Sequence, residues 1–309
     1  MKYEGRQGVL TRLLLKRRLL AEGDERHKAL RPMLMILSGV MRGVYGSGQI
    51  LALDAFRLTD AFDTVVAAST GTPTGAYFLA GQASMGIDVF SEECASKEFI
   101  KLRRMHVDVD YLASVFRGER ERRALDEDAV RASRTEFFAA ITDAVTGEGV
   151  LANAKLVTPD MVQLIRASIG VPGMSGDPTL IAGRLYIDGA ASLALPITKA
   201  VERFDPTDIL VLANSPDADQ SAFMRTLSSK AARRSYPPAV LEIFDTLQQR
   251  FDAELKFLRH GFKGGFGIIW SDHAIDPFTT DSAQLRLAGE RARDHLHTLL
   301  AHASGPTSS

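Results

Sequence analysis

The sequence predicts an α/β protein in which helices flank a central, mostly parallel sheet, and three observations support this fold class. Residues 33–80 alternate strand signals with helix signals, which is typical of a parallel sheet. Hydrophobic residues make up 45% and charged residues 24% of the 309 residues, as in an ordinary globular protein. The chain contains no internal repeat and no evident linker, so we expect one large domain.

The predicted elements follow one another in a simple order. An N-terminal extension with a basic amphipathic helix (1–30) precedes the main domain (31–302), and small polar residues predict a disordered tail (303–309). Within the domain, turn residues between apolar runs predict a hairpin of strands 136–143 and 149–155. We also expect strands at 33–37, 62–68, 184–187, 208–213 and 266–270, and helices at 44–53, 72–80, 159–168, 238–260 and 282–302.

The most informative segment is the turn between the strand at 62–68 and the following helix. Ser69 lies at the tip of this turn, within Ala67-Ala68-Ser69-Thr70-Gly71. A serine on a strand-to-helix turn is lifted out of the sheet, and the unpaired N–H groups of the helix start point towards it. A nucleophilic hydrolase needs this geometry, whereas the plainer interpretation is a small-residue turn with a helix-capping serine.

Two further segments surround this turn in the predicted sheet. The strand at 33–37 ends in a loop that contains Gly39, Val40, Met41, Arg42 and Gly43, and its N–H groups suit a phosphate or a developing oxyanion. A nucleotide site is disfavoured, because the third glycine of Gly-x-Gly-x-x-Gly and any Gly-Lys-Ser/Thr are missing. The strand at 184–187 ends in Asp188-Gly189-Ala190, and catalytic acids commonly lie at strand ends in open α/β sheets.

The order of these three segments resembles the patatin-like phospholipase family. Those proteins carry Gly-Gly-Gly-x-Arg-Gly, then Gly-x-Ser-x-Gly, then Asp-Gly-Gly or Asp-Gly-Ala, and the matching residues here are 38–43, 67–71 and 188–190. The small-residue stretch 168–173 and residues 195–197 are also similar to the family, so the resemblance covers roughly 33–270. It implies a patatin-like domain of the bacterial acyl hydrolase branch.

The resemblance also implies a reaction. Ser69 attacks a lipid acyl ester, Asp188 accepts its proton directly, and the loop N–H groups around Gly39 to Met41 hold the oxyanion. Neither a cofactor nor a metal ion is required. Arg42 orders the loop, meets a phosphate group or forms a surface ion pair.

Three positions depart from the family pattern. Ser38 and Val40 stand where the family has glycines in the loop, and Ala67 replaces the first glycine of the serine motif. A valine does not easily adopt the positive φ that glycine allows, so we expect an altered oxyanion hole if the loop needs that conformation. These departures motivate an alternative function, in which a catalytically weakened member binds lipid or a partner protein.

A second alternative is a Ser-His-Asp hydrolase. The chain order Ser69, then Asp143 or Asp188, then His273 matches that of α/β-hydrolases, and His273 follows the last predicted strand.

Composition bounds the partners and the compartment. A net charge of −1 gives no reason to expect nucleic acid as a partner. The single cysteine, Cys94, excludes an internal disulfide and fits a cytoplasmic location. No apolar run reaches the roughly 20 residues of a membrane-spanning helix. No feature predicts an oligomeric state.

The N-terminal helix leaves two interpretations open. Its leucines, among them Leu10, Leu13 and Leu14, share a helical face that is surrounded by Lys16, Arg17 and other basic residues. Such a helix packs on the domain or lies on an anionic membrane surface, which would make the protein a peripheral membrane protein.

Overall fold

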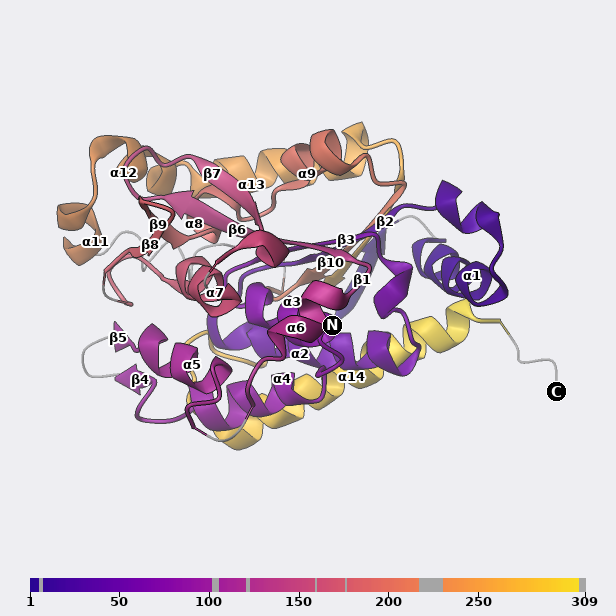
Figure 1. Cartoon of the computed structure of the whole chain (residues 1–309), viewed down its shortest axis with the longest axis horizontal. Helices are drawn as coiled ribbons and strands as arrows, with labels where there is room; N and C mark the ends of the chain where they lie inside the picture. Colours follow the sequence, from indigo (N-terminus) through magenta and orange to yellow (C-terminus); the bar gives the residue numbers. More distant parts are fainter. Residues whose placement is uncertain are drawn as a thin grey trace.

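The computed structural model describes residues 1–5, 8–101, 106–120, 123–158, 160–175, 177–216 and 230–305. Within these residues, nine strands form one sheet in the order β1-β11-β10-β2-β3-β6-β9-β8, with β7 also paired to β6 (Figure 1). The strand bounds are β1 Lys2–Gly5, β2 Pro32–Ile36, β3 Thr64–Ala68, β6 Glu136–Asp143, β7 Gly149–Asn153, β8 Thr179–Ile181, β9 Arg184–Asp188, β10 Asp208–Ala213 and β11 Gly265–Trp270. A separate pair joins β4 (Ile100–Lys101) to β5 (His106–Val107).

The helices flank this sheet, as the sequence predicts. Their bounds are α1 Val9–Glu22, α2 Gly43–Ala55, α3 Gly71–Leu79, α4 Met85–Asp88, α5 Val109–Phe116, α6 Glu127–Ala132, α7 Met161–Ile169, α8 Ala190–Leu193, α9 Ile197–Phe204, α11 Lys230–Ser235, α12 Pro238–Asp245, α13 Leu247–Lys256 and α14 Ser282–Ala303. Short 3₁₀ turns include η2 (Val40–Arg42) and η3 (Thr59–Ala61), and π-helical turns include η4 (Val89–Cys94) and η7 (Phe257–Gly261).

The centre of the sheet is parallel and its edges are antiparallel. Strands β11, β10, β2, β3 and β6 are parallel neighbours in that order. Strands β1, β7, β8 and β9 are attached by antiparallel pairs. The carboxyl ends of β2 and β3 therefore lie side by side, and the two loops of interest leave the sheet at the same edge.

Both faces of the sheet are buried, which explains the continuous apolar runs of its central strands. Leu34 and Ile36 of β2 face one layer of the core, whereas Met33 and Met35 face the other, because side chains alternate along a strand. Figure 1 shows α2 and α14 on one side of the sheet and α9 and α13 on the other.

The N-terminal residues are part of this core, so their prediction as an extension is wrong. Strand β1 pairs with β11, with Lys2 opposite Trp270. The apolar face of α1 is buried in the core, including Leu10 and Leu13. Even Lys16 is buried, and its Nζ donates to the Leu30 carbonyl and pairs with Asp63. Of the two interpretations of this helix, the structure shows the packed one for its apolar face.

Most other predicted elements match the structure. The hairpin is confirmed, with Phe138 of β6 opposite Asn153 of β7. The single helix expected at 238–260 is instead divided at Thr246 into α12 and α13 and ends in η7. Of the predicted tail, Ala303 belongs to α14, and residues 306–309 lie outside the described residues, as does position 159 of the predicted helix 159–168. In the described parts of the chain, every helix is too short or too polar to cross a membrane.

Candidate functional site

Ser69 occupies a sharp turn between β3 and α3. Its φ is +52°, a left-handed conformation that few non-glycine residues adopt, and such strain is concentrated at functional sites. Gly71 permits the turn, because a Cβ there would lie 2.2 Å from the Ile36 carbonyl oxygen of the neighbouring strand. Ala67 lies in β3, two residues before Ser69, and pairs with Ile36 and Ala139 in regular strand geometry. The alanine in place of the family glycine is therefore accommodated by an ordinary strand.

The Ser69 hydroxyl is hydrogen bonded to a buried carboxyl group. Ser69 Oγ donates to Asp188 Oδ2 over 2.6 Å, and the Ala190 N–H donates to Asp188 Oδ1 over 2.8 Å. Asp188 has no solvent-exposed surface and Ser69 is 2% exposed. Gly189 lets this segment approach β6, since a Cβ there would lie 2.0 Å from the Ala140 carbonyl oxygen. The two catalytic candidates and both flanking motif glycines thus form one close-packed unit.

Burial controls the acidity of Asp188. Removal from water disfavours the charged carboxylate and raises its pKa to about 7, although the hydrogen bonds from Ser69 and Ala190 oppose this effect. A carboxyl group with a pKa near neutrality is a much better proton acceptor than an ordinary aspartate with a pKa near 3.9. The arrangement can therefore remove the proton from the serine hydroxyl without a histidine.

Asp188 reaches the site by a route that the sequence does not reveal. We expected it at the carboxyl end of a strand in a parallel sheet. Instead, β9 runs antiparallel to β6 and pairs only with its last residues, with Asp188 opposite Ile141. Strand β9 therefore enters from beyond the end of β6 and points back towards Ser69. Strand direction depends on pairing, which local sequence signals do not specify.

Ser168 is a site residue whose role sequence reasoning missed. At the end of α7, its Oγ accepts from the Ser69 N–H over 3.1 Å and donates to the Ala140 carbonyl over 2.9 Å. Thr72 Oγ1 lies 2.7 Å from the same oxygen. Since Ser168 is fully buried, this hydroxyl ties the serine turn, α3 and β6 together in a water-free environment. The sequence signal for this role was a serine on the otherwise apolar, buried face of the helix at 161–169.

The loop after β2 adopts the conformation that we expected Val40 to resist. Val40 has a φ of +52°, so a valine does adopt a positive φ at this position. The surrounding contacts hold the strained residue in place: Met41 N–H donates to the Pro277 carbonyl over 3.2 Å, and Arg42 Nε donates to the Ile275 carbonyl over 2.8 Å. Segment 275–277 therefore fastens the loop from outside.

These contacts divide the predicted loop donors into two groups. The Met41 N–H is occupied by Pro277, so it is not a free donor as predicted. The N–H groups of Gly39 and Val40 have no acceptor among the described residues. Arg42 orders the loop, which is one of its three predicted roles, and Gly43 lets α2 start against Thr70, whose Oγ1 would lie 2.8 Å from an added Cβ.

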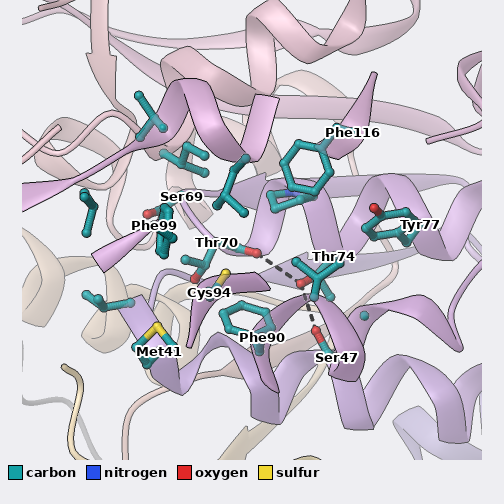
Figure 2. Close-up of a pocket in the computed structure, with 18 of the residues that line it drawn as sticks. Met41, Ser47, Ser69, Thr70, Thr74, Tyr77, Phe90, Cys94, Phe99 and Phe116 are labelled. Carbon is teal, nitrogen blue, oxygen red and sulfur yellow. Dashed lines mark hydrogen bonds between the residues drawn. The ribbon is translucent and has the colours of Figure 1, made fainter. Parts of the chain in front are cut away.

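Ser69 opens onto a narrow apolar cavity. The cavity has a volume of about 60 Å³, and its walls include residues of α3, η4, α5 and α7, with Phe90, Phe99 and Phe116 among the lining side chains (Figure 2). Thr74 Oγ1 donates to the Thr70 carbonyl over 3.0 Å, so the hydroxyl of this wall residue is already paired. Cys94 also lines the cavity, and burial raises the pKa of its thiol, which makes it a poor nucleophile.

The alternative histidine, His273, makes no hydrogen bond to the Ser69–Asp188 pair in the described parts of the chain. Its side chain is exposed. Asp143, the other acid of that alternative, accepts from the Val145 and Thr146 N–H groups of the hairpin turn. The geometry favours the Ser69–Asp188 pair over a Ser-His-Asp triad.

One family model and several solved structures are similar to this chain. A family model described as patatin-like phospholipase matches residues 34–201. VipD from Legionella pneumophila is 12% identical, with a TM-score of 0.47, over 87% of this chain and 67% of VipD. A chain in the crystal structure of full-length SpcU with full-length ExoU, from the type III secretion system of Pseudomonas aeruginosa, is 14% identical, with a TM-score of 0.34. That match covers 75% of this chain and 54% of the other, so this chain spans about half of that protein's length. No curated protein matches the chain.

The free Val40 N–H can be tested with a pair of substitutions. Val40→Pro removes the N–H and imposes a φ near −65°, whereas Val40→Gly keeps the N–H and allows the observed φ. If this N–H stabilises a negative charge that forms at Ser69, we expect the proline variant to react with a fluorophosphonate about 10²–10³ times more slowly. The glycine variant should react at close to the wild-type rate. Equal rates for the two variants, with both folded by circular dichroism, would rule out the Val40 N–H as a donor.

Proposed function

Because the chain belongs to the patatin-like phospholipase family, we propose that it is a serine acyl hydrolase that cleaves lipid acyl esters with a Ser69–Asp188 dyad. The observation that carries this proposal is the 2.6 Å hydrogen bond from Ser69 Oγ to a carboxyl group that is fully buried. A buried carboxyl group of raised pKa beside a strained serine is costly to maintain for structure alone, and such groups are concentrated in active sites.

The proposed reaction proceeds in two steps. Ser69 Oγ forms a bond to the ester carbonyl carbon while Asp188 accepts the hydroxyl proton, and the proton then passes to the alcohol oxygen as the ester C–O bond breaks and the acyl enzyme remains. The Gly39 and Val40 N–H groups and the start of α3 stabilise the oxyanion. In the second step, Asp188 accepts a proton from water as the water oxygen attacks the acyl carbon. The bond from that carbon to Ser69 Oγ then breaks, the proton returns from Asp188 to Ser69 Oγ, and the fatty acid is released.

The lining of the cavity supports the proposal that the protein recognises the acyl chain of its substrate. Its walls are almost entirely apolar, and Figure 2 shows Ser69 and Tyr77 at opposite sides of it. Tyr77 lies six residues beyond the first residue of α3, which corresponds to about 9 Å along the helix. Such apolar walls suit a hydrocarbon chain, which gains about 0.8 kcal/mol for each buried CH₂ group.

The same features weigh against a catalytically weakened binding protein. That alternative rested on Ser38, Val40 and Ala67, yet Val40 adopts a positive φ and Ala67 lies in a regular strand.

We also infer that the enzyme acts in the cytoplasm and meets its lipid at a membrane surface.

The dyad predicts unequal effects of three substitutions. Ser69→Ala and Asp188→Asn should each reduce hydrolysis of p-nitrophenyl esters by at least about a thousandfold, because they remove the nucleophile and the base. His273→Ala should retain close to wild-type activity, since this exposed side chain does not contact either residue. Steady-state kinetics of the purified variants provides the measurement. A folded but inactive His273→Ala protein would overturn the dyad in favour of a triad.

The raised pKa of Asp188 predicts how activity depends on pH. The base must be ionised, so kcat/KM should rise with pH and level off above an apparent pKa of about 7. The profile of kcat/KM against pH for a simple ester, measured with the wild-type protein, tests this expectation. A profile that is already flat from pH 5 upwards would mean that Asp188 is not the group whose ionisation limits the rate.

The same raised pKa predicts that the stability of the folded protein falls as pH rises, whereas its activity increases. Because folding raises the Asp188 pKa from an unfolded value near 3.9, its contribution to stability is present below pH ~4 and is lost as pH rises through about 7. Asp188→Asn should therefore have a higher Tm than wild type at pH 8, and the difference should shrink towards pH 4. Thermal unfolding at both pH values separates this effect from a general loss of packing, which would lower Tm at both.

The shape of the cavity predicts selectivity for chain length. Val89 lines the cavity and is buried, so Val89→Phe should place a ring in the space that a long acyl chain needs. We expect kcat/KM for p-nitrophenyl palmitate to fall at least about tenfold relative to p-nitrophenyl acetate, which corresponds to ~1.4 kcal/mol of lost binding. Val89→Ala, the matched control, should keep the wild-type ratio or raise it. If Val89→Phe affects both esters equally, the acyl chain binds elsewhere.

A further inference from the structure

A second recess lies at the amino ends of the central strands, whereas Ser69 lies at their carboxyl ends. It has a volume of about 660 Å³ and is lined by Arg17, Arg18, Arg57, Arg134 and Asp60, together with small apolar residues of α1 and α2. We refer to these five residues as the arginine recess. Residues 57–61 precede β3 and position 134 precedes β6, so the recess lies at the amino ends of these strands. Figure 1 shows α1 at one end of the molecule and α5, which lines the apolar cavity, towards the other.

Three of the four arginines of the recess, Arg17, Arg57 and Arg134, form no ion pair among the described residues. Among the described residues, the only ion pair of its four arginines is Arg18 with Glu22, at 3.8 Å on the exposed surface of α1. Arg17 Nη1 donates to the Phe56 carbonyl over 2.9 Å, which holds its guanidinium at the end of α2. Four guanidinium groups therefore face one carboxylate, Asp60, in a chain whose net charge is only −1.

Repulsion between like charges opposes this arrangement, so an anion that binds there would be strongly favoured. A guanidinium group donates two parallel hydrogen bonds to a phosphate, and it is the residue of choice for phosphate recognition. Glu22 neutralises Arg18, so the other three arginines and Asp60 leave an excess of two positive charges. Two phosphodiester groups, which carry one negative charge each, match that excess.

We propose that the arginine recess binds an anion that carries two or more phosphate groups, either on a lipid headgroup or in a soluble molecule. This site is separate from Ser69 and does not depend on the proposed hydrolase activity. Occupation of the recess would also place the exposed surface of α1 against the ligand, so a lipid source would hold the protein at a membrane by its basic side chains, without insertion of the buried leucines of α1.

The experiment measures binding in the Ser69→Ala background, so that no hydrolysis takes place. The full chain is titrated with inorganic tripolyphosphate in a calorimeter at low ionic strength. The test variant is Arg57→Gln with Arg134→Gln, because both side chains are exposed and substitution should not disturb folding. The control variant is Arg291→Gln with Arg293→Gln, which removes the same charge from exposed positions on α14.

We expect tripolyphosphate to bind the parent and control proteins with Kd values within about twofold of each other, and the test variant at least about tenfold more weakly. Binding should also weaken as salt is added. Two results would overturn the proposal: no measurable binding by the parent, or an equal loss in the control variant. A poly-glutamate peptide that binds the parent as tightly as tripolyphosphate would also overturn it, because the recess would then recognise acidic protein rather than phosphate.

A vesicle arm distinguishes the two sources of phosphate. Flotation is measured with phosphatidylcholine vesicles that contain diphosphatidylglycerol, which carries two phosphate groups, or phosphatidylserine at the same total charge. If only the diphosphatidylglycerol vesicles retain the parent protein and the test variant is released, the ligand is a lipid headgroup. If the tripolyphosphate result holds while neither vesicle binds, the ligand is a soluble anion.

Discussion

The hydrogen bond between Ser69 Oγ and Asp188 Oδ2 is the interaction on which the rest of the site depends. This 2.6 Å hydrogen bond joins two segments that are 119 residues apart in the chain. Because Asp188 is fully buried, an ionised carboxylate there would be strongly disfavoured without donors, and Ser69 and Ala190 supply two. The same burial raises its pKa to about 7, which makes the carboxyl group useful as a base. Stability and reactivity are thus coupled through one desolvated group.

Close backbone contacts hold the two segments within hydrogen-bonding reach. Gly71 lies against the Ile36 carbonyl, and Gly189 lies against the Ala140 carbonyl, at separations that no side chain allows. Ser168 links Ala140 to the serine turn by its buried hydroxyl. The motif glycines are therefore required by packing between strands, in addition to any role of their own N–H groups. A site built on such contacts has little freedom to move, which favours a preorganised oxyanion hole.

Two of the six non-glycine residues with a positive φ in the described parts of the chain face the proposed reaction centre. Ser69 and Val40 both have a φ of +52°, although neither is a glycine. Strain of this kind costs about 1–3 kcal/mol for each residue and persists only where surrounding contacts impose it. At Val40 the contacts come from segment 275–277, whose carbonyls accept hydrogen bonds from Met41 and Arg42. Val40 therefore keeps a left-handed conformation although it is not a glycine, because distant residues hold the loop in place.

The sequence alone determined the fold class and most strands and helices, and it indicated Ser69 and Asp188 as the candidate catalytic pair. The fold predictions succeeded because they rest on local signals: alternating apolar runs, turn residues and short motifs in a specific order. Tertiary structure alone decided the antiparallel entry of β9, the incorporation of β1 and α1 into the core, and the role of Ser168. It also decided that Val40 adopts a positive φ and that the Met41 N–H is occupied by Pro277. Each of these depends on a partner that is distant in the chain, and the energy of such a contact is not encoded in the neighbouring residues.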